Sequence, residues 1–397
     1  MIKSHTQALA EPDGQAKERS QLVMQSIKRA CASAGGWIRF SEFMNISLYQ
    51  PGLGYYSGGL QKFGEQGDFI TAPEVSSLFG QCLAGQVTDI LQNMALGDEA
   101  CIIEFGAGSG TLAIDILLRL EKLGLLPEKY LILELSAELQ HRQQQTIKQK
   151  AVHLYDRVQW LNQLPDDVSK AVVIANEVLD AMPVECFSVS DKDVQALMVG
   201  VEDEKLVTAY VVDHEASEKI DSIKQRSEIV FTEDYGSEYN PAITGWLSAL
   251  ENKLEQAVIL LIDYGYNEKE YYHADRSMGT LMCYYQHKAH SDYFWWPGLQ
   301  DITAFVNFTD VAYGAVASGL EVSGYTTQAA FLLANGLFEL HAEQVTDDAQ
   351  QQIKLSQQIK TLTLPSEMGE RFKVIALTKN YNEPLQGFSL LDLRNRL

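Results

Sequence analysis

The stretch that decides the fold reads Ile102-Ile103-Glu104-Phe105-Gly106-Ala107-Gly108-Ser109-Gly110-Thr111-Leu112. Its first half is apolar, as in a buried strand, and three glycines follow at alternate positions. The residues after the last glycine have helical spacing. Because glycine has no Cβ, a glycine-rich backbone can turn sharply and approach a ligand closely. The stretch therefore predicts a strand, a tight turn and a helix that together hold a nucleotide-like cofactor.

Strands and helices alternate from about residue 100 onward, which is typical of a parallel α/β sheet. The expected strands are 101–105, 129–135, 157–161, 171–175 and 257–262, and the expected helices are Thr111–Lys122, Ala137–Lys150 and Ile243–Lys253. Three further strands, Glu185–Ser190, 196–201 and 207–212, are expected to be antiparallel.

The two ends of the chain have weaker patterns. N-terminal helices are predicted at 21–34, from a cap at Ser41, and at 76–91. In the C-terminal third the predicted strands are 279–285, 302–308, 321–325 and Phe372–Lys379, and the predicted helices are 309–318 and 327–335. The glutamine-rich segments 143–149 and 350–358 are interpreted as solvated helix faces.

Composition limits the kind of protein this can be. The 397 residues include 31 Lys and Arg against 53 Asp and Glu, a net charge of −22, which disfavours binding to nucleic acid. The five cysteines form no CxxC pair, as expected of reduced thiols. No segment approaches the ~20 apolar residues of a membrane span, and the N-terminus has no signal-peptide pattern. We expect a soluble, cytoplasmic protein.

Three kinds of cofactor use a glycine turn of this type. A P-loop requires Lys followed by Ser or Thr, which the turn lacks, and a dinucleotide fingerprint requires glycine where Thr111 stands. Alternate glycines after an acidic strand residue are instead the pattern of S-adenosylmethionine (SAM) methyltransferases. The candidate cofactor residues of the turn are Glu104, Gly106, Ala107, Gly108 and Gly110.

The next expected strand supports an adenosine cofactor. Glu134 stands at its carboxyl end, 24 residues after Gly110. A carboxylate at this place can accept both hydroxyls of a ribose, whichever adenosine cofactor is bound. Glu134 is therefore the predicted ribose ligand, and the glycine spacing is what separates SAM from NAD.

Polar residues also follow two other strands. Asn176, Glu177 and Asp180 come after the strand 171–175, and Asp263 and Tyr264 follow the strand 257–262. Ligands of open α/β sheets bind beyond the carboxyl ends of the strands. Helix capping alone does not need two carboxylates and an amide, so these residues are predicted to face the substrate and the cofactor.

Taken together, several motifs resemble those of the MidA-like methyltransferases, a family that includes the mitochondrial complex I assembly factor 7. The matching segments are Gly67-Asp68-Phe69-Ile70-Thr71-Ala72-Pro73-Glu74, Phe79-Gly80, the glycine turn, Asn176-Glu177-Val178-Leu179-Asp180-Ala181-Met182-Pro183, Asp263-Tyr264-Gly265, Gly279-Thr280-Leu281 and Pro297-Gly298-Leu299-Gln300-Asp301-Ile302-Thr303. They run in order through residues 40–380. One departure stands out, because the family has His and Asp where this chain has Phe305 and Asn307.

The resemblance implies a class I, Rossmann-like SAM methyltransferase and, in the mitochondrial relatives, symmetric dimethylation of an arginine in a complex I subunit. The pattern along the chain predicts a mobile tail at residues 1–20 and, at 21–95, a helical and glycine-rich region that serves as a substrate lid. Residues 96–397 would be the methyltransferase domain, with insertions around 185–240 and 266–310.

The expected acceptor is an arginine of a protein partner. A guanidinium is always charged in water, and carboxylates can orient it through paired hydrogen bonds. Glu177, Asp180 and Asn176 are the predicted catalytic residues, and Asn176 is also a candidate ligand of SAM. The predicted substrate-binding residues are Asp68, Thr71, Pro73, Glu74, Asp263 and Tyr264.

Other interpretations remain open at this point. His287, His290 and Asp292 have a spacing that could ligate a metal, but methyl transfer needs none, and we expect no metal site. The aromatic run 293–297 is either core or a docking surface. The chain could be a SAM-binding assembly factor without catalysis, or a nucleotide-dependent oxidoreductase, and a homodimer is possible.

Overall fold

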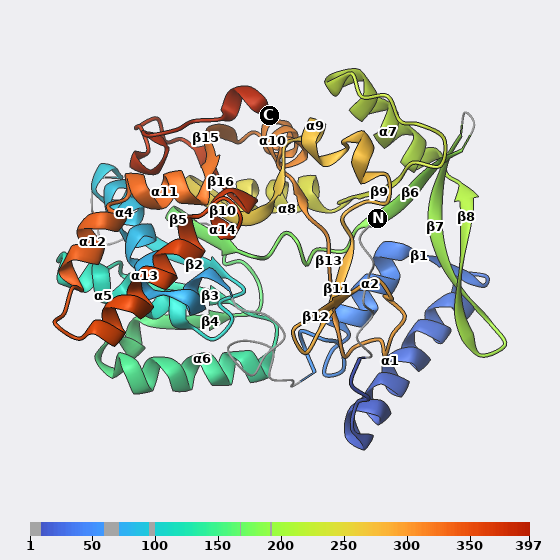
Figure 1. The fold of residues 1–397 in the computed structure, drawn as a ribbon, viewed down its shortest axis with the longest axis horizontal. Coiled ribbons are helices and arrows are strands. Elements are labelled where there is room, and N and C mark those ends of the chain that lie inside the picture. Colours follow the sequence, from blue (N-terminus) through green and yellow to red (C-terminus); the bar gives the residue numbers. More distant parts are fainter. Residues whose placement is uncertain (1–8, 59–70, 95–99, 167, 191–192) are drawn as a thin grey trace. The chain divides into compact units, whose positions relative to one another are not determined.

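The computed structural model describes residues 9–58, 71–94, 100–166, 168–190 and 193–397 (Figure 1). The chain folds into two compact units, each built from three separate segments. Unit 1 comprises Met1–Phe69, Asp180–Ala242 and Glu268–Phe305, and unit 2 comprises Ile70–Leu179, Ile243–Asn267 and Val306–Leu397. The segments expected as insertions, 185–240 and 266–310, fall largely within unit 1.

Unit 2 is built on a sheet of eight strands among the described residues. In spatial order they are β15 (Glu321–Thr327), β16 (Phe372–Lys379), β10 (Leu254–Tyr266), β5 (Val168–Asn176), β2 (Ala100–Phe105), β3 (Lys129–Leu133) and β4 (Val158–Leu161), and β14 (Val306–Asn307) pairs with β10. The five strands from β10 to β4 are parallel, and β16 and β15 extend the sheet in antiparallel pairing. The predicted α/β fold with a parallel sheet is confirmed.

The central strands are apolar on both sides because helices cover both faces of such a sheet. Every residue of β2 is buried. The register places Glu104 beside Ile132 of β3 and Ile174 of β5, and Ile262 of β10 beside Asn176 of β5. The carboxyl ends of these parallel strands therefore lie along one edge of the sheet.

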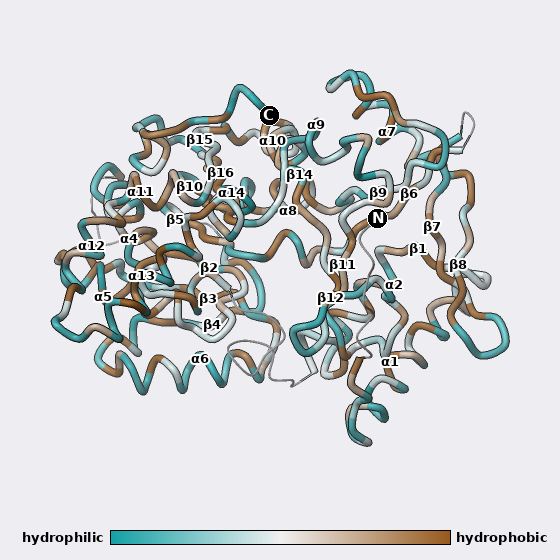
Figure 2. Tube along the Cα trace, viewed as in Figure 1, coloured by the Kyte–Doolittle hydropathy of each residue, from teal (hydrophilic) through white to brown (hydrophobic). Residues whose placement is uncertain are grey.

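The helices of unit 2 pack on this sheet or on one another. They are α3 (Ala72–Val75), α4 (Ser77–Asn93), α5 (Thr111–Lys122), α6 (Ala137–Lys150), α8 (Ile243–Lys253), α10 (Phe308–Ala317), α11 (Gln328–Ala334), α12 (Leu337–Glu343), α13 (Ala349–Thr363) and α14 (Met368–Arg371). Figure 2 shows α6 as mostly hydrophilic, with short hydrophobic stretches. No helix in the described part of the chain is both long enough and apolar enough to cross a membrane.

Unit 1 has a different architecture, with two small antiparallel sheets and a few helices. Its five-stranded sheet contains β1 (Trp37–Arg39), β6 (Glu185–Ser190), β7 (Asp193–Glu202), β8 (Lys205–Val212) and β9 (Gly236–Tyr239), and its second sheet contains β11 (Met282–Tyr285), β12 (Lys288–His290) and β13 (Asp301–Thr303). The helices are α1 (Gly14–Ser33), α2 (Phe40–Tyr49), α7 (His214–Ser227) and α9 (Glu268–Tyr271). One apolar cluster, which includes Val23, Ile27, Phe40 and Phe43, joins α1 and α2 to the sheets.

Several predicted boundaries in unit 1 were wrong. Helix α1 begins at Gly14 instead of residue 21, because the side chain of Asp13 caps it by accepting from the Ala16 N–H at 2.8 Å. Residues 14–20, expected in a mobile tail, are therefore helical. Helix α2 begins at Phe40, and Ser41 does not cap it but donates its hydroxyl to Glu185.

The prediction of a single strand over 302–308 was also wrong. It contains the end of β13, the short β14 and the start of α10. Asn307 causes the change of structure, since its side chain accepts from the Asp310 N–H at 3.2 Å and caps α10. Aspartate would cap a helix equally well, so the departure from the family pattern at this position preserves a structural role.

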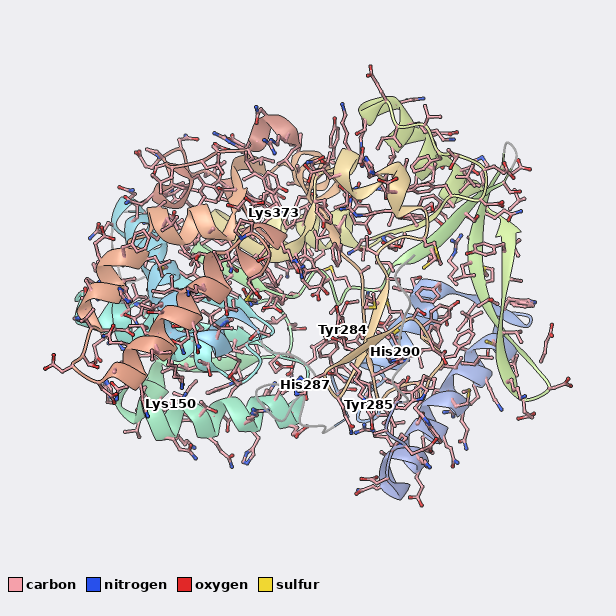
Figure 3. The ribbon with its side chains drawn as sticks, viewed as in Figure 1. Lys150, Tyr284, Tyr285, His287, His290 and Lys373 are labelled. Atoms are coloured by element: carbon pink, nitrogen blue, oxygen red, sulfur yellow. The ribbon has the colours of Figure 1, made fainter. Side chains whose placement is uncertain are left out.

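The β11–β12 hairpin carries the two histidines that suggested a metal (Figure 3). Gln286 and His287 form its two-residue turn with φ of 48° and 62°, the left-handed conformation of a type I′ hairpin turn. His290 lies edge-on to the ring of Trp295, at 6.0 Å between centroids. Within the described residues no group of three or more His, Cys, Asp or Glu side chains is placed to hold a metal ion.

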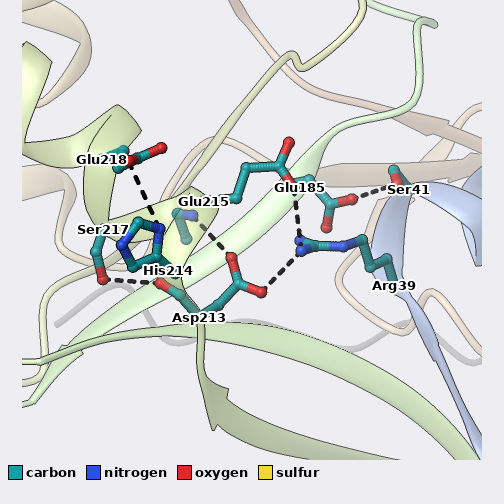
Figure 4. A network of polar contacts seen from close by, with 9 residues as sticks. Arg39, Ser41, Glu185, Asp213, His214, Glu215, Ser217 and Glu218 are labelled. Atoms are coloured by element: carbon teal, nitrogen blue, oxygen red, sulfur yellow. Dashed lines mark hydrogen bonds and ion pairs between the residues drawn. The ribbon is translucent and has the colours of Figure 1, made fainter.

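A network of polar contacts joins β1 to α7, and beside it Ser41 of α2 donates to Glu185 of β6 (Figure 4). Arg39 forms ion pairs with Asp213 at 2.7 Å and with Glu215 at 3.2 Å. Asp213 also caps α7 by accepting from the Ala216 N–H. The network therefore fixes the start of α7 against the edge strand β1, within unit 1.

Candidate cofactor and catalytic site

The glycine turn follows β2 and leads into α5, as the sequence predicts. Gly106, Gly108 and Gly110 have φ of 61°, 52° and 83°, all in the left-handed region that glycine adopts at little cost. The Gly106 N–H donates to the Leu133 carbonyl at 3.1 Å, which fixes the turn to β3. A Cβ at Gly110 would stand 3.3 Å from the Cα of Gln143. The turn therefore needs glycine for its conformation and, at Gly110, for its close approach to α6.

Glu134 lies beside this turn, after β3. Its side chain is 7% exposed, and its Oε1 accepts from the Ser136 N–H at 2.9 Å. Its Oε2 accepts from Nε2 of Gln143 at 3.1 Å. The predicted ribose ligand is thus held in one orientation by its neighbours, as a ligand of fixed geometry must be.

Gln143 is a residue of this site that the sequence interpretation missed. Its Nε2 also donates to the Gly108 carbonyl at 3.1 Å, and its Oε1 accepts from the indole N–H of Trp160 at 2.9 Å. Gln143 is fully buried, so its interpretation as part of a solvated face was wrong. The signal that could have found it is its spacing, four residues from Leu139 and from Ile147, the other buried residues of α6.

Glu104 lies in β2, two residues before the first glycine of the turn. Its Oε2 accepts from the Tyr130 hydroxyl at 2.8 Å, and its side chain is 2% exposed. Burial raises the pKa of Glu104 to about 7, the bond from Tyr130 lowers it, and the charge of Glu134 raises it. Glu104 therefore supports the site from the core, close enough to Glu134 for their charges to interact.

Asn176 is the last residue of β5, and Glu177 follows it at the same sheet edge. Asn176 donates from Nδ2 to Oε1 of Glu177 at 3.2 Å, and the Ala72 N–H donates to the same oxygen at 3.4 Å. Oδ1 of Asn176 is buried and has no hydrogen-bond partner among the described residues. A buried acceptor without a partner is costly, so this oxygen fits a site that a ligand donor completes.

The backbone of Glu177 is unusual. Its φ is 53°, and its N–H donates to the Ile262 carbonyl of β10 at 2.9 Å. A left-handed conformation costs a non-glycine residue about 1–3 kcal/mol and concentrates at functional sites. The strain turns the chain at the sheet edge and holds the Glu177 carboxylate against Asn176.

Among the predicted substrate-binding residues, Asp68 lies outside the described residues. Thr71 precedes α3 and Pro73 is buried within it. Glu74 accepts a hydrogen bond from the hydroxyl of Ser109, so the structure places its carboxylate at the glycine turn.

Asp263 and Tyr264 belong to β10 and come directly after Ile262, its last residue paired with β5. Asp263 is fully buried, and its two oxygens accept from the Leu179 N–H at 3.0 Å and the Tyr264 N–H at 2.9 Å. The ring of Tyr264 packs on Phe372 at 5.6 Å between centroids. Asp263 therefore braces the turn that carries Glu177.

Asp180 belongs to unit 1, because the boundary between the units falls after Leu179. Its carbonyl accepts from the Ala304 N–H at 3.1 Å. Nearby, the Tyr56 hydroxyl lies 3.0 Å from both carboxylate oxygens of Asp301. Burial, then the charges of Asp301 and Asp180, hold the pKa of Tyr56 well above its usual range. Asp180, Tyr56 and Asp301 therefore form one group of interacting polar side chains in unit 1.

Comparison with known proteins identifies the family of the chain. The model of a family described as "Putative S-adenosyl-L-methionine-dependent methyltransferase" matches residues 82–326, and the chain belongs to this family. The protein is a SAM-dependent methyltransferase, and SAM is its cofactor.

Two kinds of relative are similar over nearly the whole chain. The mitochondrial protein arginine methyltransferase NDUFAF7 of Danio rerio is 26% identical over 94% of this chain and 95% of its own, and that of Homo sapiens is 28% identical over 89% and 82%. A crystal structure from Burkholderia thailandensis with S-adenosyl-homocysteine bound is 39% identical, with a TM-score of 0.92 over 98% of this chain and all of its own. A second structure from that organism has a TM-score of 0.89 and 38% identity.

Proposed function

We propose that this methyltransferase modifies an arginine side chain of a protein partner. The observation that carries the proposal is the Glu177 carboxylate, held at the sheet edge by Ala72 and Asn176 in a strained backbone. The names of the NDUFAF7 relatives, which are protein arginine methyltransferases, support the same acceptor.

The residues of the glycine turn and its surroundings have the chemistry that SAM binding needs. Glu134 would accept from the ribose hydroxyls, the glycine turn would admit the amino-acid part of the cofactor, and Oδ1 of Asn176 would accept from its ammonium. When bound, SAM supplies a methyl group that its sulfonium already activates. The protein's task is to place the acceptor in line and to exclude water.

An arginine acceptor sets a specific task for Glu177. A guanidinium carries its proton at any physiological pH, so a nitrogen must lose a proton as it gains the methyl carbon. A fixed carboxylate orients the guanidinium by charge-assisted hydrogen bonds and concentrates electron density on the reacting nitrogen. Glu177 would receive the proton that leaves, and the bond between the methyl carbon and the sulfur of SAM would break to leave S-adenosyl-homocysteine, which balances the step.

The identity of the modified residue tests the proposal. The purified protein is incubated with tritiated SAM and extract from a strain that lacks the gene, and labelled protein is hydrolysed to amino acids. We expect the label in methylated arginine. Label in lysine, glutamine or a non-protein compound would overturn arginine as the acceptor.

We also propose that the protein acts in the cytoplasm. All five cysteines are buried and free, which supports a reducing compartment. Fractionation of cells with an antibody against the protein tests this, and enrichment in a membrane or organelle fraction would contradict it. A homodimer stays a prediction, which light scattering of the purified protein tests.

A further inference from the structure

Helix α3 makes two polar contacts at its two ends. The Ala72 N–H donates to Oε1 of Glu177, and two residues later the Glu74 carboxylate accepts from the Ser109 hydroxyl. Ser109 stands between Gly108 and Gly110 in the cofactor turn, and it is 9% exposed. One short helical turn therefore touches both the cofactor turn and the carboxylate proposed to work on the acceptor.

The contact between Glu74 and Ser109 belongs to a larger polar group at the start of α5. Oγ of Ser109 lies 2.8 Å from Oγ1 of Thr111, and the Thr111 N–H points to the same Oγ at 3.4 Å. Asp115 follows one turn further along α5. Burial, opposed by Lys150 and aided by the charge of Glu74, raises the pKa of Asp115 to about 7. The Glu74 carboxylate thus lies close to the first two turns of α5.

Packing keeps α3 and α4 in place against α5. A Cβ at Gly80 of α4 would stand 2.5 Å from the Cβ of Asp115, so glycine at 80 permits the two helices to touch there. Ser76 caps α4 by accepting from the Leu78 N–H at 3.3 Å, directly after α3 ends. A shift of the glycine turn would therefore displace α3.

We propose that Glu74 is a positioning residue that couples the cofactor turn, through Ser109, to the Ala72 amide and so to Glu177. The role of Glu74 in binding the substrate stays a prediction beside this one. With Glu74 bound to Ser109, the turn keeps the conformation that admits the cofactor and Ala72 keeps Glu177 oriented. The inference rests on the methyltransferase activity and does not depend on arginine as the acceptor.

Four variants test the coupling: Glu74→Ala, Ser109→Ala, the double variant, and Glu74→Gln. Binding of S-adenosyl-homocysteine is measured by calorimetry, and methyl transfer is measured as tritium incorporated into extract of a strain lacking the gene, at saturating SAM. A hydrogen bond to a charged group supports an expected loss of about tenfold in affinity for Glu74→Ala. We expect the rate at saturating SAM to fall by a similar factor, because Ala72 no longer holds Glu177.

The pattern among the variants separates coupling from a general structural effect. We expect Ser109→Ala to match Glu74→Ala, and the double variant to be no worse than either single change. Glu74→Gln still accepts the hydroxyl proton, so it should recover most of the loss and remain about threefold weaker than the natural protein. Glu138→Ala on the exposed face of α6 is the matched control.

Three results would overturn the proposal: losses that add in the double variant, a loss of affinity with an unchanged rate at saturating SAM, or an unaffected Glu74→Ala. If urea unfolding shows that Glu74→Ala does not fold, the same measurements of affinity and rate on Ser109→Ala and Glu74→Gln test the proposal. Failure here would leave the assignment of arginine intact, since that depends on the labelled amino acid.

Discussion

The side-chain amide of Gln143 donates a hydrogen bond to the carboxylate of Glu134 over 3.1 Å, and both side chains are buried. The same amide reaches the Gly108 carbonyl. A single glutamine on α6 thus fixes two parts of the proposed cofactor site, Gly108 and Glu134, which the sequence separates by 26 residues.

Replacement of Gln143 should weaken cofactor binding. Gln143→Leu keeps the side chain's approximate volume but removes the hydrogen bonds to Glu134 and Gly108, of which the one to the carboxylate is worth about 1.5–3 kcal/mol. We expect the Kd for S-adenosyl-homocysteine, measured by calorimetry, to rise at least about tenfold. Gln149→Ala, exposed on the same helix, serves as the control. Equal affinity in Gln143→Leu and the natural protein would exclude this role.

Gly279 should be essential for the stability of unit 1. Its φ is 72°, and an added Cβ would stand 2.1 Å from Oε2 of Glu238. Glu238 is buried and cannot move away easily, because Tyr271 and Thr280 donate hydrogen bonds to it. We expect Gly279→Ala to lower the free energy of unfolding by about 3 kcal/mol, from strain and displacement together.

The control for this change is Gly245→Ala in α8, where an added Cβ meets no atom within 4 Å. Alanine in a helix should be neutral or should stabilise the protein by about 0.5–1 kcal/mol. Urea unfolding followed by circular dichroism measures both variants. Similar unfolding free energies for Gly279→Ala and Gly245→Ala would show that the contact with Glu238 does not require glycine at position 279.

Glu104 should make the stability depend on pH. Burial raises its pKa in the folded protein to about 7, so the folded state binds its proton more tightly than the unfolded chain. The contribution of Glu104 to the free energy of unfolding is fully present below its unfolded pKa of about 4.3. It is lost as the pH rises through its folded pKa of about 7. The shift of roughly 2.5 units corresponds to about 3 kcal/mol.

Glu104→Gln cannot ionise but can still accept from Tyr130. The unfolding free energy of the natural protein minus that of the variant should therefore be about 3 kcal/mol larger at pH 4.5 than at pH 8. Urea titrations at four pH values measure it. A difference that stays constant with pH would contradict ionisation of Glu104 in this range.

The ion pair of Arg226 with Glu268 should contribute strongly to unit 1. Glu268 is 1% exposed and also accepts from the hydroxyl of Ser227, and Arg226 donates to it from Nε at 2.9 Å. Loss of one partner of a buried pair leaves the other charge uncompensated, which costs about 3–5 kcal/mol. We expect Glu268→Ala to lose that much in urea unfolding. Asp166→Asn, which breaks an exposed pair with Lys253, should lose under about 1 kcal/mol.

The sequence predicted the sheet of unit 2 well because its strands are apolar runs bounded by glycine or polar residues. The strand at 257–262 lies within β10, and the turn after β2 has glycine at each position with positive φ. Local chemistry of this kind can be read without knowing which segments meet. The α/β fold and the cofactor followed from it.

Contacts between distant segments could not be predicted in the same way. Gln143 lies in a segment with a polar average, and only its inward position distinguishes it from its neighbours. Glu74 and Ser109 are 35 residues apart, and nothing in either local pattern indicates their hydrogen bond. The boundary between the two units likewise falls between Glu177 and Asp180, only three positions apart, and no local pattern marks it.

The division of roles between Glu177 and the glycine turn is tested most directly by Glu177→Gln, measured for cofactor binding and for methyl transfer. The glutamine can still accept from Ala72 but cannot take up a proton. We predict that the Kd for S-adenosyl-homocysteine stays within about threefold, while tritium transfer from SAM to extract of a strain lacking the gene falls at least about 100-fold. Turnover equal to that of the natural protein would contradict the role of Glu177.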